Sequence, residues 1–148
     1  TGSESGTHCS YSYHMPFGSN YALTVSSEPG FAVASERNPW LDSPAGEAQT
    51  WGAFQPDVTG FPNGTTETAK FGNAMAHQQE GQNVMFLDTH VEFEKRAYCS
   101  VEDDNIYTGS SVANGGPDEK GAQPNLKSVP KSRKDSLLMH DPEKWGVR

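Results

Sequence analysis

Residues 77–94, with the sequence HQQEGQNVMFLDTHVEFE, constrain the fold more than any other stretch of the chain. Valine and phenylalanine alternate with other residues on both sides of a short connection at residues 88 and 89. This alternation predicts a β-hairpin, because successive side chains of a strand point to opposite faces of a sheet. We expect antiparallel strands at 82–87 and 90–98. The apolar side chains expected to face each other and to be buried together are Phe86 with Val91 and Val84 with Phe93.

The connection itself contains Asp88 and Thr89. Threonine is β-branched and resists positive φ, so we do not expect the two-residue type I′ turn that Asp-Gly favours. A four-residue loop from Leu87 to His90 keeps the same facing pairs, and this is the loop we expect.

The composition predicts a lean core with long surface loops. Only 33% of the 148 residues are hydrophobic, and the chain contains 15 Gly and 10 Pro. We expect an α+β fold that leans to mainly β, with a small antiparallel sheet in residues 1–108. Residues 109–148 are rich in Gly, Pro, Lys, Ser and Asp, and we interpret them as an extended C-terminal arm. The arm can dock on the core or on a neighbouring subunit, and we expect the second. The apolar residues expected to anchor it are Leu137, Leu138, Met139 and Trp145.

Other strands are expected to be short. Candidates lie at 10–13, 21–25 and 31–35, with an edge strand at 106–107. Between residues 38 and 68, proline and glycine exclude any long regular element. Four aromatic residues punctuate this loop: Trp40, Trp51, Phe54 and Phe61. We expect them to anchor the loop to the core. The alternative is an exposed recognition surface, as in a carbohydrate-binding module that uses Trp40, Trp51 and tyrosines.

The charge balance limits the classes of partner. The chain has 11 basic and 19 acidic residues, a net charge of −8 and an isoelectric point near 5.0. Nucleic acids and anionic membrane surfaces select for basic patches, so neither is expected as a partner. No stretch of the sequence approaches the ~18–20 apolar residues that a membrane span needs.

The hairpin segment also carries residues that resemble the signature of a known family. In the planctomycete prepilin-like proteins, which are relatives of type II secretion pseudopilins, a His and a Gly-rich stretch precede Asn-Val-aliphatic-Phe and Asp-Gly-His-Val-Glu-Phe. The matching residues are His77, Gly81, Asn83, Val84, Phe86, Asp88, His90, Val91, Glu92 and Phe93. The resemblance covers roughly residues 9–108, and Thr89 stands where the family has its turn glycine.

The resemblance implies a non-enzymatic structural component of a pilus-like or pseudopilus-like assembly outside the cell or in its envelope. The fold it implies is a pseudopilin-like C-terminal domain, in which the sheet packs on an N-terminal helix. A leader and this helix are expected upstream of residue 1, so contact with a membrane is expected only through that helix. The expected partners are other copies of the chain or other envelope proteins.

Cys9 and Cys99 are the two cysteines, so one intrachain pairing is possible. The export route that the resemblance implies favours a disulfide between them. In the chain-entropy model such a bond contributes on the order of 4–5 kcal/mol. Two reduced thiols are the alternative.

A run of oxygen-bearing side chains offers a candidate cation site. Asp103, Asp104 and Asn105 lie in an expected loop beside a strand, and clustered oxygen ligands suit Ca²⁺. Major pseudopilins use a C-terminal Ca²⁺ loop, so the resemblance also favours this ion. The alternative is a solvated acidic turn.

A second candidate set is His77, Asp88 and His90. Imidazole and carboxylate ligands suit Zn or Fe, and this set defines the alternative function of a small metal-dependent hydrolase. Against it, Asp in a turn commonly caps its own backbone. The sequence has no Gly-x-Ser-x-Gly nucleophile elbow, and we do not expect an enzyme.

The arm also carries a small basic cluster, at Lys127, Lys131, Arg133 and Lys134. Two explanations suit this cluster equally well. The first is a solvated linker, and the second is a contact with the acidic core of a neighbouring subunit. Charge complementarity of the second kind steers association more than it adds affinity.

Overall fold

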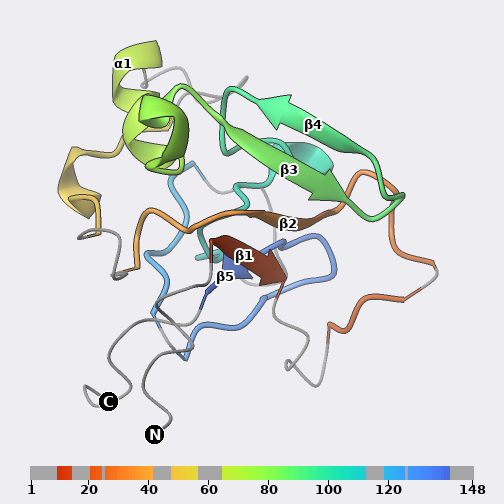
Figure 1. Cartoon of the computed structure of the whole chain (residues 1–148). Helices are drawn as coiled ribbons and strands as arrows, with labels where there is room; N and C mark the ends of the chain where they lie inside the picture. Colours follow the sequence, from red (N-terminus) through yellow and green to blue (C-terminus); the bar gives the residue numbers. More distant parts are fainter. Residues whose placement is uncertain are drawn as a thin grey trace, which may run out of the picture.

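The computed structural model describes residues 10–14, 21–24, 26–41, 48–56, 65–112, 119–125 and 127–140. Its centre is a five-stranded antiparallel sheet in the order β4-β3-β2-β1-β5 (Figure 1). The strands are β1 (Tyr11–His14), β2 (Ala32–Glu36), β3 (Gln82–Phe86), β4 (Val91–Glu94) and β5 (Leu138–Met139). The expected small antiparallel sheet with long loops is confirmed.

Helical segments in the described residues are short. They are α1 (Thr66–Ala69) and 3₁₀ turns at Trp51–Ala53, Lys70–Gly72, Ala76–Gln79 and Val101–Asp103. None of these helices has the length and apolar character needed to cross a membrane. The expected strand at 21–25 is not formed over residues 21–24, and Val25 lies outside the described residues.

The hairpin forms where the alternation predicts it, but its second strand ends at Glu94 rather than at residue 98, and its register is shifted by one residue. Met85 faces Val91 and Asn83 faces Phe93, so the expected pairs of Phe86 with Val91 and Val84 with Phe93 are wrong. On β3 the side chains of Val84 and Phe86 are buried, at 0% and 4% exposure. On β4 Val91 and Phe93 are 64% and 44% exposed. The four apolar side chains therefore lie on two opposite faces of the sheet.

The connecting loop explains the shift. It has three residues, Leu87 to Thr89, closed by hydrogen bonds from Thr89 N to Phe86 O at 2.9 Å and from Phe86 N to His90 O at 3.0 Å. Thr89 has φ 75° and is the residue of this loop with positive φ, as in a type I turn completed by a left-handed residue. The turn is not type I′, as expected, but the expected four-residue loop is wrong. One residue fewer in the loop moves every facing pair by one position.

Among the described residues, loops cover the inner face of the sheet. Sheet residues such as Val84 and Phe86 pack against aromatic and aliphatic residues of the segments 38–41, 48–56 and 97–107. Trp40 lies 5.1 Å from Phe54 and 4.8 Å from Trp51, measured between ring centroids. Trp40 and Phe54 are buried, so they anchor the long loop as expected; Phe61 lies outside the described residues.

The C-terminal region contributes to this same core. Leu137, Leu138 and Met139 are buried within the single chain, and β5 pairs with β1. The expectation that a neighbouring subunit orders these three residues is therefore corrected, whereas Trp145 lies outside the described residues. The amide of Asn38 holds the region in place, because its Nδ2 donates to the carbonyls of Tyr107 and Leu138, both at 2.8 Å.

His14 is a buried polar residue on β1. Its ring lies edge-on to Phe31 with 5.0 Å between centroids, and neither ring nitrogen has a hydrogen-bond partner among the described residues. Burial lowers the pKa of His14 from 6.5 to about 4. Because the unfolded chain binds this proton more readily than the folded chain, acid favours unfolding between these two pH values.

We therefore expect the free energy of unfolding to fall as the pH is lowered from 6.5 toward 4, with His14 contributing up to about 3 kcal/mol of that loss. The variant His14→Leu should lose this part of the pH dependence. Urea unfolding of both proteins at about pH 7 and about pH 4.5 measures it. Equal pH dependence in the two proteins would show that His14 is not the sensitive group.

Candidate functional site

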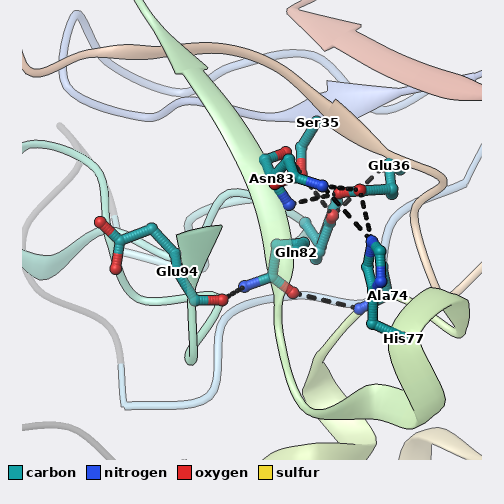
Figure 2. A network of polar contacts seen from close by, with 8 residues as sticks. Ser35, Glu36, Ala74, His77, Gln82, Asn83 and Glu94 are labelled. Atoms are coloured by element: carbon teal, nitrogen blue, oxygen red, sulfur yellow. Dashed lines mark hydrogen bonds and ion pairs between the residues drawn. The ribbon is translucent and has the colours of Figure 1, made fainter. Parts of the chain in front are cut away.

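Three polar residues, Glu36, His77 and Asn83, form a cluster at one end of β3 (Figure 2). The amide N–H of Asn83 donates to Glu36 Oε2 at 2.6 Å, and Asn83 Nδ2 donates to Glu36 Oε1 at 2.7 Å. His77 Nε2 lies 3.2 Å from the same Oε1 and 3.3 Å from Asn83 Nδ2. We call these residues the Glu36 cluster; two of them, His77 and Asn83, belong to the sequence signature.

An unusual backbone turn presents His77 to this cluster. His77, Gln78 and Gln79 have φ values of 51°, 55° and 64°, a left-handed conformation that non-glycine residues rarely adopt. Asn73 holds the turn, because its Nδ2 donates to the carbonyls of Gln79 and Lys95, both at 2.9 Å. The strained turn thus persists because the surrounding structure fixes it.

Neighbouring polar residues extend the same support across the sheet. Gln82 Nε2 donates to the carbonyl of Glu94 at 3.0 Å and its Oε1 accepts from Ala74 N at 3.2 Å (Figure 2). Ser35 Oγ donates to Asn83 O at 2.9 Å and lies 2.8 Å from the hydroxyl of Tyr107. The hydrogen bonds of Gln82 and Ser35 thus connect β2 and β3 with other segments of the chain.

The Glu36 cluster acts as a clamp, which means that its hydrogen bonds hold separate segments of the chain together. The Glu36 side chain is only 12% exposed, and it accepts from two N–H groups of Asn83 beside the imidazole of His77. The hydroxyl of Ser35 is already bonded within the sheet. The arrangement therefore ties β2, β3 and the turn before β3 together.

Two further signature residues, Asp88 and His90, lie beyond the opposite end of β3. Asp88 Oδ1 accepts the His90 N–H at 3.2 Å and also contacts His90 Nδ1. These hydrogen bonds from His90 lower the pKa of Asp88. The ring of His90 stacks on Phe86 with 4.5 Å between centroids. Asp88 thus caps the hairpin turn.

The structure does not bring together the candidate metal ligands His77, Asp88 and His90. His77 contacts the first half of β3, and the other two follow its end, about 15 Å away for a strand of this length. Throughout the described ranges, no three His, Cys, Asp or Glu side chains are grouped closely enough to hold a metal ion.

The candidate calcium ligands make contacts within the protein. Asp104 Oδ2 accepts from Ser136 N at 2.7 Å, and Asn105 Oδ1 accepts from Tyr107 N at 3.0 Å. Asp103 is exposed, with φ 59°. Asp104 therefore ties this acidic run to the segment that leads into β5.

Cys99 is a partly buried thiol beside the aromatic core. Burial raises its pKa well above the usual value, and the neighbouring Glu94 and Asp104 raise it further. A thiol in this environment is a poor nucleophile. Cys9 lies outside the described residues, so the Cys9–Cys99 disulfide stays a prediction.

The sheet also presents a surface that the shifted register creates. Cross-strand pairs run from Tyr13 to Ala34, from Ala34 to Met85 and from Met85 to Val91, so these side chains share one face. We call this surface the outward face; its exposed large apolar residues are Tyr11, Tyr13, Met85, Val91 and Phe93.

The Glu36 cluster lies at one end of the outward face. Tyr11 pairs with Glu36 and Asn83 with Phe93, and the ring of His77 meets Phe93 edge-on at 5.5 Å between centroids. On β4 the acidic residues Glu92 and Glu94 have the opposite orientation, because they face the buried positions of β3. The apolar side of this edge strand thus points away from its own core.

Comparison of the chain with protein-family models, curated proteins and solved structures finds no match.

Replacing the Glu36 carboxylate should weaken the clamp. In Glu36→Gln an amide N–H₂ would oppose the donors of Asn83, so one buried hydrogen bond is lost. We expect the free energy of unfolding to fall by about 1–3 kcal/mol. Urea unfolding measures it, with the exposed Glu28→Gln as the control. Equal stability of the two variants would contradict the clamp.

Gly81 should not tolerate a side chain. A Cβ at this position would lie 2.8 Å from two ring atoms of Phe93 and would also collide with the Glu94 carbonyl. We expect Gly81→Ala to be destabilised by about 1–3 kcal/mol. Gly52→Ala is the matched control, since a Cβ there meets no atom within 4 Å. If both variants unfold at the same urea concentration, the close approach of Phe93 is not a constraint.

Proposed function

We propose that this chain is a non-enzymatic structural component of a pilus-like or pseudopilus-like assembly at the cell envelope, and that it joins the assembly through the outward face. The orientation of the β4 side chains supports this proposal, because the apolar ones point away from the core. Val91 and Phe93 are exposed on the outward face, whereas Glu92 and Glu94 project from the opposite side of the strand, where Glu92 is also exposed and Glu94 is half-buried. A strand patterned in this way gains stability only when another surface covers its apolar side.

The size of the outward face fits one protein interface. Its five large side chains have exposed fractions between 38% and 64%. At about 200 Å² for a large side chain, they expose roughly 500 Å² together. A standard interface buries roughly 800 Å² on each partner, a little over half of it apolar. The outward face therefore supplies about the apolar area that one such contact requires.

The partner that suits this face is an apolar helix. The face carries tyrosine, methionine, valine and phenylalanine side chains, with the polar Glu36 cluster at its end. The resemblance to prepilin-like proteins implies a helix upstream of residue 1 that packs on the sheet in this way. The same helix would complete the core of the domain and connect it to the envelope.

The polar groups support a structural role rather than catalysis. His77 and Asn83 are engaged with Glu36, and Asp88 caps the hairpin turn with His90. Asp104 ties the acidic run to the segment before β5. The signature residues His77, Asn83, Asp88 and His90 thus have polar partners within the fold.

Polar substitution of the outward face should abolish assembly without unfolding the domain. In Val91→Ser/Phe93→Ser, two exposed apolar side chains are removed, so the stability of the isolated chain should change by only about 1 kcal/mol. Incorporation of the full-length protein into the envelope complex, measured by cosedimentation from its native cells, should be lost. The control is Met75→Ser/Val112→Ser, which removes exposed apolar residues elsewhere. Normal incorporation of the Val91→Ser/Phe93→Ser protein would contradict the proposal.

A further inference from the structure

A groove lies beside the hairpin loop, at the opposite end of β3 from the Glu36 cluster. Its volume is about 630 Å³, and it is lined by Leu23, Thr24, Ser27, Pro29, Leu87 and Asp88. Three of these residues are apolar, and the exposed carboxylate of Asp88 stands on the rim. The lowered pKa of Asp88 keeps that carboxylate ionised at neutral pH. The exposed Glu28, between two lining residues, adds a second acidic group to this region.

The walls of the groove are held in place by hydrogen bonds. Leu87 N donates to Phe31 O at 2.9 Å, and Asp88 N donates to Pro29 O at 3.3 Å. On the other wall, Thr24 N donates to Ser27 Oγ at 3.1 Å. The groove is therefore formed before any ligand enters, which lowers the entropy lost on binding.

A segment elsewhere in the same chain has complementary properties. In residues 127–131, Val129 is 41% exposed and is flanked by the exposed Lys127 and Lys131. The turn before it is fixed, because Ser128 N donates to Asn125 O at 2.8 Å. Beyond it, Pro130 is buried and Lys131 N donates to Asp135 Oδ2 at 2.6 Å. Val129 is thus a single apolar side chain held outward between two cations.

We propose that the segment 127–131 of one copy of this chain docks into the groove of a second copy. Val129 enters between Leu23 and Leu87, and the two flanking lysines face the acidic rim at Asp88 and Glu28. An apolar centre with opposite charges on the rim is the usual anatomy of a protein–protein contact. This inference rests on the proposed function, because it names a self-contact within the same assembly.

The contact is heterologous, since the groove and the segment 127–131 are different surfaces of the chain. Each copy that donates its segment keeps an unfilled groove, so the contact can propagate into a filament or close into a ring. It leaves the outward face free for its own partner. Lys134 pairs with Glu102 in the same chain, and Glu28 also attracts its charge, so among the described residues the rim keeps Asp88 as the acidic group without a lysine of its own chain beside it.

Complementation between two variants of the full chain tests this contact. Asp88→Lys reverses the charge of the groove, and Val129→Asp disables the segment; Thr24→Arg blocks the groove independently if Asp88→Lys does not fold. Sedimentation velocity of the wild type should show association that grows with concentration beyond the dimer. Raising the salt from about 50 mM to about 500 mM should increase its apparent dissociation constant by about tenfold.

Each variant alone should be monomeric, whereas an equimolar mixture of a groove variant and Val129→Asp should give a 1:1 dimer and nothing larger. Val112→Asp, which changes an exposed valine elsewhere, should associate like the wild type. A monomeric wild type, wild-type association of Val129→Asp, or a mixture without dimers would overturn the inference. Association lost in Val91→Ser/Phe93→Ser but kept in Val129→Asp would support the outward face alone and reject the groove contact.

Discussion

The three-residue hairpin loop sets the orientation of every side chain on β4. Because Thr89 takes the left-handed conformation, Phe86 pairs with His90 instead of Val91, and the whole strand is displaced by one position. Val91 and Phe93 then point away from the core that Val84 and Phe86 enter. The function proposed for the chain follows from this local geometry, since a longer loop would have turned the apolar side of β4 inward.

In the part of the chain that the structure describes, loops take the place of a covering helix on the inner face of the sheet. Aromatic side chains from loops, Trp40 and Phe54 among them, fill the inner face. Side-chain amides hold loops and strand ends together: Asn38 reaches Tyr107 and Leu138 of β5, and Asn73 holds the left-handed turn at His77. These buried hydrogen bonds do the positioning that helix packing does in larger domains, and leaving one of them unpaired costs about 1–3 kcal/mol.

Alternation and composition predicted the strands on either side of the hairpin, the β-rich class and the anchoring of the long loop by Trp40 and Phe54. The register was not predictable from alternation, because Val91 and Phe93 suit either face and the choice depends on the φ angle of Thr89. Strand β5 was missed because two residues carry no periodic pattern. In the site, His77 and Asn83 were identified from the signature, whereas Glu36 lies too far away in sequence for any local pattern to connect it with them.

If the proposal holds, the outward face is open in the isolated chain and covered in the assembly. Paramagnetic relaxation of the Val91 methyl signals by a soluble relaxation agent tests this in both states without changing the sequence. We expect strong relaxation in the purified chain and its loss in the assembled full-length protein. Methyl groups already protected in the purified chain, or equally relaxed in the assembly, would contradict it.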